Sequence, residues 1–290
     1  MERFEHNGLS LEYKIQGQGV PFVFLHGMGG SVTQIDNMYL PIEGVQLITL
    51  NQEGHGESDV DWEHYDFDYL ADDVIALMDQ LGIEKAYFGG ISMGAAVSLN
   101  IAVRYPERVM KLLLIRNAWL DMPMAPDRRQ AYADMGDCLR DRDIERFYQT
   151  AGWQIVKEHS AYTKGAFTCT FSEETNVKNW QKYFILPSKQ PIPNREVLSQ
   201  LTMPVYIIAN RNDFCHPFEY GEFLHQMIAH SEFYEVPDKD KDSAGHKTGI
   251  NQVIRKMIER SESDISVCTS DYSGGKVTSQ ESQYDIANRR

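Results

Sequence analysis

Two features that mark secreted and membrane proteins are scarce in this sequence. Only four cysteines occur among 290 residues, and no two of them have the close spacing of a pair: Cys138, Cys169, Cys215 and Cys268. This pattern indicates free thiols in a reducing compartment rather than a disulfide framework or a zinc site. Residues 1–19 lack the apolar core of a secretory signal, and no run approaches the roughly 18 apolar residues of a membrane span. We therefore expect a soluble cytoplasmic protein.

Basic residues are also fewer than acidic residues. The chain has 28 lysine and arginine residues against 42 aspartate and glutamate residues, which gives a formal net charge of −14 at pH 7. Because nucleic acids and anionic membranes bind to basic surfaces, we expect neither as a partner. We also expect no cofactor and no metal ion. The length suits one α/β domain with an insertion, and the sequence leaves the oligomeric state open.

Short apolar runs alternate with helical patterns along the first 116 residues. Residues 67–81 place apolar side chains at helical spacing, and Gly82 follows as a stop signal. Continuous apolar runs are typical of strands that are buried on both faces. The alternation therefore predicts an α/β fold with a mostly parallel sheet that is flanked by helices. The expected strands lie at 9–15, 20–25, 45–50, 86–88 and 109–115, and a further helix at 95–105.

The alternation stops near residue 117 and returns at residues 204–209. The intervening residues, up to about 200, are rich in charge and aromatic side chains and have a mostly helical pattern. We interpret residues 117–200 as an insertion between two parts of one core, 1–116 and 201–260. The second part is expected to hold helices at 218–228 and 247–260 and a short strand at 232–236. Residues 261–290 have little apolar periodicity, which predicts a disordered tail.

The segment from Gly90 to Gly94 reads Gly-Ile-Ser-Met-Gly, and it lies between an apolar run and a helical pattern. A serine on a sharp turn from a strand into a helix has a strained backbone, and side chains two positions to either side are expected to collide with the turn. Glycines at both positions remove those side chains. This context, more than the motif alone, predicts that Ser92 is a nucleophile.

A serine hydroxyl needs a base that accepts its proton and a third group that orients the base. Of the nine histidines, His246 is the best candidate for the base, because it lies in a predicted loop between the last strand and the last helix. Asp213 follows the strand at 204–209, at the sheet edge where parallel sheets gather functional groups. The order Ser92, Asp213, His246 is the order that nucleophile-elbow hydrolases use. We therefore predict a catalytic triad of these three residues.

Attack on a carbonyl creates an oxyanion that main-chain N–H groups can stabilise. Met93 follows the nucleophile, and Met28 lies in the glycine-rich turn after residues 20–25, so their N–H groups are the predicted oxyanion hole. The same turn could be read as a dinucleotide-binding loop. That interpretation fails, because Val32 stands where a third glycine is needed and the next strand ends in Asn51 rather than an acidic residue.

Together these pieces resemble the α/β-hydrolase superfamily over about residues 8–260. The segments that carry the resemblance are Gly17–Pro21, His26–Gly30, Gly54–Ser58, Gly90–Gly94, Arg104–Val109, Asp213 and Gly245-His246. Within the superfamily the chain is similar to enol-lactonases, carbon–carbon bond hydrolases, cofactor-free haloperoxidases and small carboxylesterases. The resemblance implies that residues 117–200 form a helical cap over the site. It also exposes one departure: Asn51-Gln52-Glu53 replaces the usual Asp-x-Arg before the Gly-x-Gly-x-Ser turn, so an anion stands where relatives have a cation.

Three functions remain open at this point. The first is a serine hydrolase that cleaves a small ester, thioester or lactone through an acyl-enzyme on Ser92, with a small-molecule acyl substrate bound among cap aromatics. The second is carbon–carbon bond hydrolysis of a diketone acid, for which Arg116, Arg128, Arg129, Lys189 and Arg195 are possible cationic clamps. The third is a non-catalytic ligand receptor on the same fold. The sequence does not identify the substrate or its acyl length.

Overall fold

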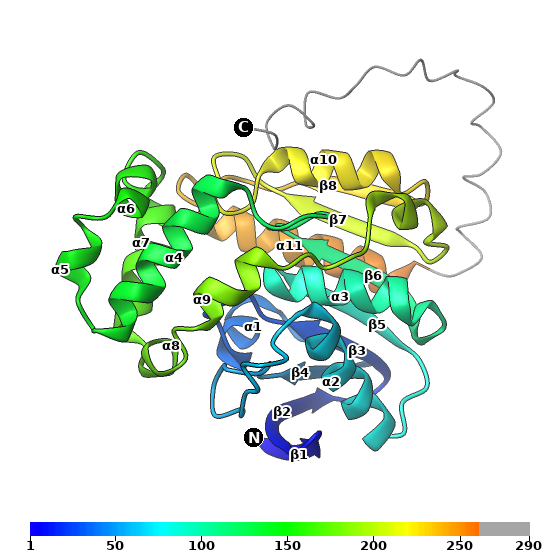
Figure 1. The fold of residues 1–290 in the computed structure, drawn as a ribbon. Coiled ribbons are helices and arrows are strands. Elements are labelled where there is room, and N and C mark those ends of the chain that lie inside the picture. The colour runs from blue at the N-terminus through cyan, green and yellow to red at the C-terminus, as the bar shows by residue number, and fades with distance from the viewer. Residues whose placement is uncertain (261–290) are drawn as a thin grey trace.

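The computed structural model of this chain describes residues 1–260. Within them one eight-stranded sheet has the order β1-β2-β4-β3-β5-β6-β7-β8 (Figure 1). The pairs β1–β2 and β2–β4 are antiparallel, and every other pair is parallel. This confirms the predicted mostly parallel sheet. The strands are β1 (Glu2–His6), β2 (Leu9–Gly17), β3 (Val20–Leu25), β4 (Val45–Leu50), β5 (Ala86–Ile91), β6 (Val109–Ile115), β7 (Val205–Ala209) and β8 (Ser231–Glu235).

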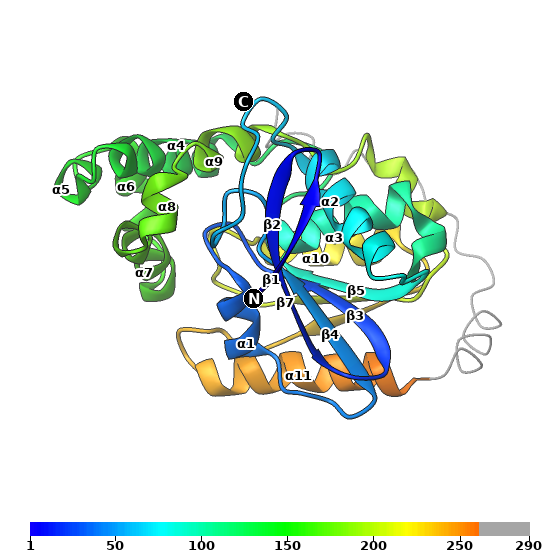
Figure 2. The same cartoon turned by 90° about the horizontal axis from the view of Figure 1, so that it is seen from below.

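Helices cover both faces of the sheet, which is why its central strands are apolar on both sides (Figure 2). One face carries α1 (Val32–Met38) and α11 (Ser243–Glu259), and the other carries α2 (Phe67–Gln80), α3 (Met93–Arg104) and α10 (Phe218–Met227). Each face has its own buried apolar cluster. Every residue of β5 and β7 is buried, so the continuous apolar runs expected for the sheet centre are confirmed.

Between β6 and β7 the chain leaves the sheet and forms helices that stand beyond one edge of the core (Figure 1). These helices bury a separate apolar cluster that includes Phe147 and Phe167. The domain boundaries drawn from the sequence stay a prediction, and the tail predicted at 261–290 lies outside the described residues. The helices are α4 (Pro126–Arg140), α5 (Ile144–Phe147), α6 (Ala151–Val156), α7 (Ala161–Cys169), α8 (Glu174–Lys178) and α9 (Lys182–Ile185). Short 3-10 helices are η1 (Pro106–Arg108), η2 (Thr170–Ser172), η3 (Leu186–Ser188) and η4 (Arg195–Gln200).

The structure departs from the sequence-based elements in three places. It adds β1 and α1, neither of which was predicted. It also begins α11 at Ser243, so His246 lies in the first turn of a helix rather than in the predicted loop. The cause is local, because the side chain of Asp242 accepts a hydrogen bond from the Gly245 N–H and caps the helix four residues earlier than expected.

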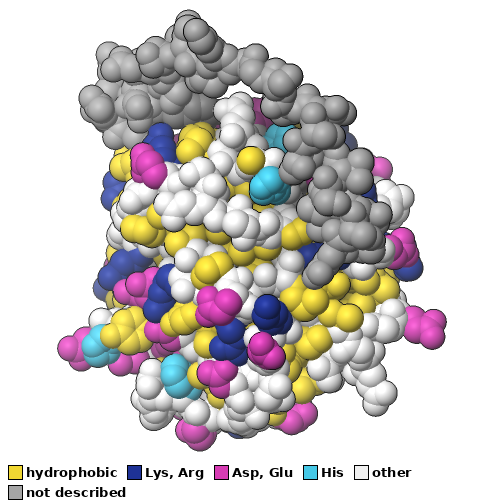
Figure 3. Space-filling view, turned by 90° about the vertical axis from the view of Figure 1, so that its right-hand side faces the viewer, with side chains coloured by type: hydrophobic (Ala, Val, Ile, Leu, Met, Phe, Trp, Pro, Cys, Tyr) yellow, Lys and Arg dark blue, Asp and Glu magenta, His cyan; other side chains and the backbone are white. Residues whose placement is uncertain are grey.

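Acidic and basic side chains are interspersed on the face that Figure 3 shows. The three cysteines within residues 1–260, Cys138, Cys169 and Cys215, are free. Over the same residues, every helix falls short of the length or the apolar character that crossing a membrane requires.

Candidate active site

Ser92 lies at the sharp turn between β5 and α3. Its backbone has φ 57° and ψ −111°, a region that non-glycine residues rarely occupy. The Ser92 N–H donates a 2.9 Å hydrogen bond to the Ile115 carbonyl at the end of β6, which fixes the turn to the sheet. The side chain is 8% exposed. A strained serine at the end of a central strand is the geometry expected of a nucleophile elbow.

The two flanking glycines are required for different reasons. A Cβ atom on Gly90 would lie 2.0 Å from the carbonyl carbon of Gly94, so the turn itself excludes a side chain there. A Cβ atom on Gly94 would lie 2.3 Å from the Leu25 carbonyl oxygen. The obstacle at Gly94 is therefore the end of β3 and not the turn, which corrects the reason given from the sequence. Both clashes are with backbone atoms, which cannot move aside cheaply.

The predicted oxyanion donors lie in two adjacent turns. A Cβ atom on Gly27, in the turn after β3, would lie 3.3 Å from the Cβ of Ser92. The neighbouring N–H groups in that turn are engaged: Gly27 donates to Gln34 Oε1 at 2.7 Å and Gly29 to His55 Nε2 at 3.1 Å. No hydrogen bond to another residue of 1–260 occupies the N–H of Met28 or Met93. Their role at an oxyanion stays a prediction.

A cavity of about 190 Å³ lies over Ser92, between the turn after β3 and the helices beyond β6. Tyr132, Phe167 and Tyr183 line it, and the Tyr132 and Phe167 rings pack with their centroids 5.0 Å apart. Other aromatic side chains of these helices, such as Phe147 and Trp153, pack against one another instead. The cavity next to Ser92 thus has aromatic rings on one side, while Arg116, Asp213 and His216 also line it.

Asp213 lies in the loop after β7, as predicted, but its carboxylate is already occupied. Arg116 donates to Oδ2 from Nε at 2.9 Å, and the ring Nδ1 of His216 lies 2.9 Å from both carboxylate oxygens. Burial acts to raise the pKa of Asp213, but His216 and Arg116 outweigh it and hold that pKa well below its usual range. Asp213 is therefore a buried, ionised carboxylate.

Arg116 follows β6 directly and has a positive φ of 54°. Its guanidinium side chain is 5% exposed and lies 5.1 Å from the centre of the Tyr162 ring. The sequence offered Arg116 as one of several unplaced cationic clamps, whereas in the structure its cation is paired with Asp213. It lines the cavity over Ser92 and also a second cavity that contains His246.

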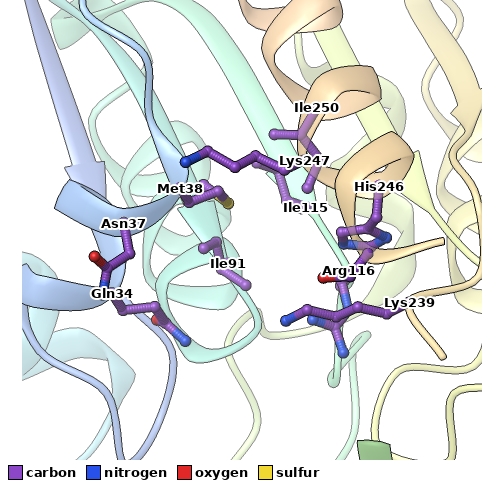
Figure 4. Close-up of a pocket in the computed structure, with 11 residues that line it drawn as sticks. Gln34, Asn37, Met38, Ile91, Ile115, Arg116, Lys239, His246, Lys247 and Ile250 are labelled. Carbon is purple, nitrogen blue, oxygen red and sulfur yellow. The ribbon is translucent and has the colours of Figure 1, made fainter.

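His246 forms no hydrogen bond with Ser92 or Asp213 among the described residues. Its ring points into the second cavity, and Nδ1 lies 2.9 Å from the Pro237 carbonyl oxygen (Figure 4). Burial lowers the pKa of the His246 imidazole to about 4. The structure therefore places the three predicted residues at one end of the sheet without joining them in a hydrogen-bonded triad.

His216 was not singled out from the sequence. It lines the same cavity as Ser92, and its Nδ1 contacts the carboxylate of Asp213. Burial lowers the pKa of His216 below its ordinary value. Its position three residues after Asp213 was the one available signal, and a histidine in a loop is too common for that spacing to identify it.

The unusual Asn51-Gln52-Glu53 segment has no cationic side chain of its own. Hydrogen bonds from backbone N–H groups hold it in place instead. Asn51 Oδ1 accepts from the Val32 N–H at 2.8 Å, and Glu53 Oε2 accepts from the Asp61 N–H at 2.8 Å. Burial raises the pKa of Glu53 to about 8. The cation next to this turn is Lys182 of α9, which is fully buried and donates to the Gly54 carbonyl at 2.9 Å. The helices beyond β6 therefore supply a hydrogen-bond donor to this turn, and burial lowers the pKa of that lysine to about 7.

Comparisons with known proteins agree with this fold. The family described as alpha/beta hydrolase fold matches residues 20–244. The AB hydrolase superfamily protein YisY of Bacillus subtilis (strain 168) is 28% identical over 77% of this chain and 89% of its own length. 3-Oxoadipate enol-lactonase 2 of Acinetobacter baylyi is 24% identical over 74% of this chain and 79% of its own. The crystal structure of the enol-lactonase from Burkholderia xenovorans LB400 has a TM-score of 0.73 at 17% identity, and the match covers 89% of this chain and 100% of that one.

Proposed function

This chain belongs to the α/β-hydrolase fold family, and we propose that it is a serine hydrolase that cleaves a small ester, thioester or lactone through an acyl-enzyme on Ser92. The observation that carries the proposal is the strained turn at Ser92, with the N–H groups of Met28 and Met93 beside it and without protein acceptors among residues 1–260. The aromatic side chains that line part of the cavity over Ser92 support a small acyl group as the ligand.

In this reaction the Ser92 hydroxyl oxygen attacks the substrate carbonyl carbon while a histidine accepts its proton. The carbonyl oxygen becomes an oxyanion, and each well-placed N–H donor stabilises it by about 3 kcal/mol. The tetrahedral intermediate then collapses, the histidine returns the proton to the leaving group, and Ser92 carries the acyl group. Water, deprotonated by the same histidine, attacks the acyl-enzyme carbonyl; the bond from Ser92 Oγ to the acyl carbon then breaks, the histidine returns the proton to Ser92, and the acid is released.

We assign the proton transfer to His246. When its Nδ1–H donates to the Pro237 carbonyl, Nε2 keeps a lone pair that can accept a proton. Its pKa of about 4 leaves the ring neutral at pH 7. For Asp213 to orient this ring, the His246 Nδ1–H has to leave the Pro237 carbonyl, and the carboxylate that Arg116 and His216 now occupy has to be freed. Bringing His246 to Ser92 is thus a conformational step in the proposal.

His216 is the competing base. It lines the cavity of Ser92 and already contacts Asp213, so it would need no displacement of Arg116 from that carboxylate. The two assignments predict that different single substitutions abolish turnover. Comparing the turnover of His246→Gln with that of His216→Asn therefore distinguishes them.

Carbon–carbon bond hydrolysis is the second candidate, because the cation of Arg116 lines the cavity over Ser92 and could face an anionic substrate. Its pairing with Asp213 weighs against this use. Turnover of esters without any turnover of dienoic diketone acids would exclude it.

The proposal is tested by assaying the protein on nitrophenyl esters, lactones and thioesters of varied acyl length. We expect turnover of at least one class, lost in Ser92→Ala. The matched control is Ser98→Ala. Ser98 is a buried serine of α3, the helix that begins directly after Ser92, and its Oγ has no hydrogen-bond partner among residues 1–260. Equal turnover by the wild type and Ser92→Ala would contradict the proposal.

A further inference from the structure

A second cavity, of about 280 Å³, shares Arg116 with the Ser92 cavity, and Figure 4 shows side chains that line it. It is bounded by α1, by the ends of β5 and β6, by the loop after β8 and by the first turn of α11. Gln34, Ile91 and Arg116 line both cavities, so the two cavities adjoin at these residues. The helices beyond β6 contribute no residue to its lining, which distinguishes it from the cavity proposed for the acyl group.

The charges around this cavity are of one sign. Arg116, Lys239 and Lys247 line it together with His246, and none of the lining residues is an aspartate or glutamate. This is the reverse of the whole chain, whose formal net charge is −14. The ammonium groups of Lys239 and Lys247, on one small cavity in an acidic protein, repel each other, and a bound anion relieves that repulsion.

Two of these cations have no counter-ion within residues 1–260. Lys239 Nζ donates to the Tyr162 hydroxyl at 3.0 Å and lies 4.1 Å from the centre of that ring, but it forms no ion pair, and Lys247 forms none either. Arg116 is paired with Asp213, which lines the Ser92 cavity. Asp242, the acid nearest in sequence to the first turn of α11, uses its carboxylate to cap the Gly245 N–H. The positive charge of Lys239 and Lys247 is therefore available to a ligand.

The remaining walls fix what else the ligand must be. Met38, Ile91, Ile115 and Ile250 give the cavity an apolar side, while Gln34, Asn37 and Ser243 add neutral polar groups. Ser243 lies in the first turn and Lys247 at the start of the second turn of α11, a 17-residue helix whose N-terminal end carries partial positive charge. The volume is at the lower end of the roughly 300–1,000 Å³ typical of ligand pockets. A small anion with a short apolar chain matches both the positively charged side and the apolar side of the cavity.

We propose that this cavity is a binding site for a small organic carboxylate with an apolar chain, separate from the cavity in which Ser92 acts. The carboxylate faces Lys239, Lys247 and the N-terminal turn of α11, and the chain lies against Met38 and Ile250. The site does not depend on the catalytic role of Ser92. It can exist whether or not the protein hydrolyses esters.

The probe is hexanoate, titrated into the Ser92→Ala protein by calorimetry or ligand-observed NMR, so that hydrolysis plays no part. We expect saturable binding of hexanoate and at least about tenfold weaker binding of hexanamide, which has the same chain without the charge. Acetate, which lacks the apolar chain, is expected to bind several-fold more weakly than hexanoate. Lys247→Gln and Lys239→Gln should each weaken hexanoate binding by about fivefold, the loss typical of a partly exposed charge contact.

Lys241→Gln is the matched control. It lies two residues from Lys239 in the same loop, its side chain is 76% exposed, and it does not line the cavity. Hexanoate binding to this variant should equal binding to the parent protein. The proposal is overturned if hexanamide binds as well as hexanoate, or if both Lys239→Gln and Lys247→Gln bind hexanoate as the control does. Every measurement uses the Ser92→Ala protein, so a negative binding result would leave the serine-hydrolase proposal untouched. Equally, disproof of the serine-hydrolase proposal would leave the carboxylate-site proposal standing.

Discussion

Arg116 and Asp213 form a buried ion pair across the ends of β6 and β7, with the guanidinium Nε 2.9 Å from the carboxylate Oδ2. The two residues are 97 positions apart in the chain. The carboxylate that the sequence assigns to orienting His246 is thus engaged by a cation in this structure. Several consequences for stability and catalysis follow from this pairing and from the buried groups near it.

Removing one partner of the pair leaves the other as an uncompensated buried charge. We expect Arg116→Met to lower the free energy of unfolding by about 3 kcal/mol, measured by urea denaturation. The double variant Arg116→Met with Asp213→Asn should lose at least about 1 kcal/mol less than the sum of the two single changes. Additive losses would show that the pair contributes no coupling.

The two candidate bases differ in their expected effect on turnover. His246→Gln should lower kcat on a nitrophenyl ester by about 10²–10⁴-fold, because a positioned general base contributes that much. His216→Asn should lower kcat far less, with a modest change in KM, because its ring lines the cavity without taking the proton. The reverse ranking would transfer the role of base to His216.

The pH dependence of turnover reports on the same ring. A general base works only when it is unprotonated, and burial lowers the pKa of His246 to about 4. We therefore expect kcat/KM to stay level as the pH falls from 8 to about 5 and to reach half its value near pH 4. A half-value at about pH 6.5, the ordinary pKa of histidine, would contradict the buried environment seen here.

Lys182 should make stability depend on pH in the alkaline range. Burial lowers its pKa from the ordinary 10.5 to about 7. Between these values the unfolded chain binds more protons than the folded one, so this contribution to stability rises as the pH rises. The difference in unfolding free energy between the wild type and Lys182→Met should grow from pH 7 to 10, with a slope approaching 1.4 kcal/mol per pH unit. A constant difference would mean that Lys182 keeps its ordinary pKa.

Gly94, two residues after the nucleophile, should tolerate no side chain. Gly94→Ala places a Cβ atom 2.3 Å from the Leu25 carbonyl oxygen, and we expect a loss of at least about 2 kcal/mol in unfolding free energy. Gly165→Ala in α7 is the matched control, because a Cβ there meets no atom within 4 Å. This control should be neutral or more stable by up to about 1 kcal/mol, since alanine favours helix. Similar melting curves for the two variants would refute the packing explanation.

The features that the sequence predicted well are those encoded locally. The apolar runs of β3 and β6 match their strands, and the glycines around Ser92 identified its turn, because backbone sterics act over a few residues. The start of α11 was missed because a single cap at Asp242 moved it. The pairing of Arg116 with Asp213 could not be predicted, since charged side chains have no periodicity and the partners meet only after β6 and β7 align.

The central claim, that Ser92 is the nucleophile, is tested most directly by labelling with a fluorophosphonate probe, followed by intact-mass and peptide mass spectrometry. The account predicts one adduct per wild-type chain, located on the peptide that contains Ser92, and none on Ser92→Ala. A folded wild-type protein that takes up no label, or that takes it up on a different residue, would contradict it.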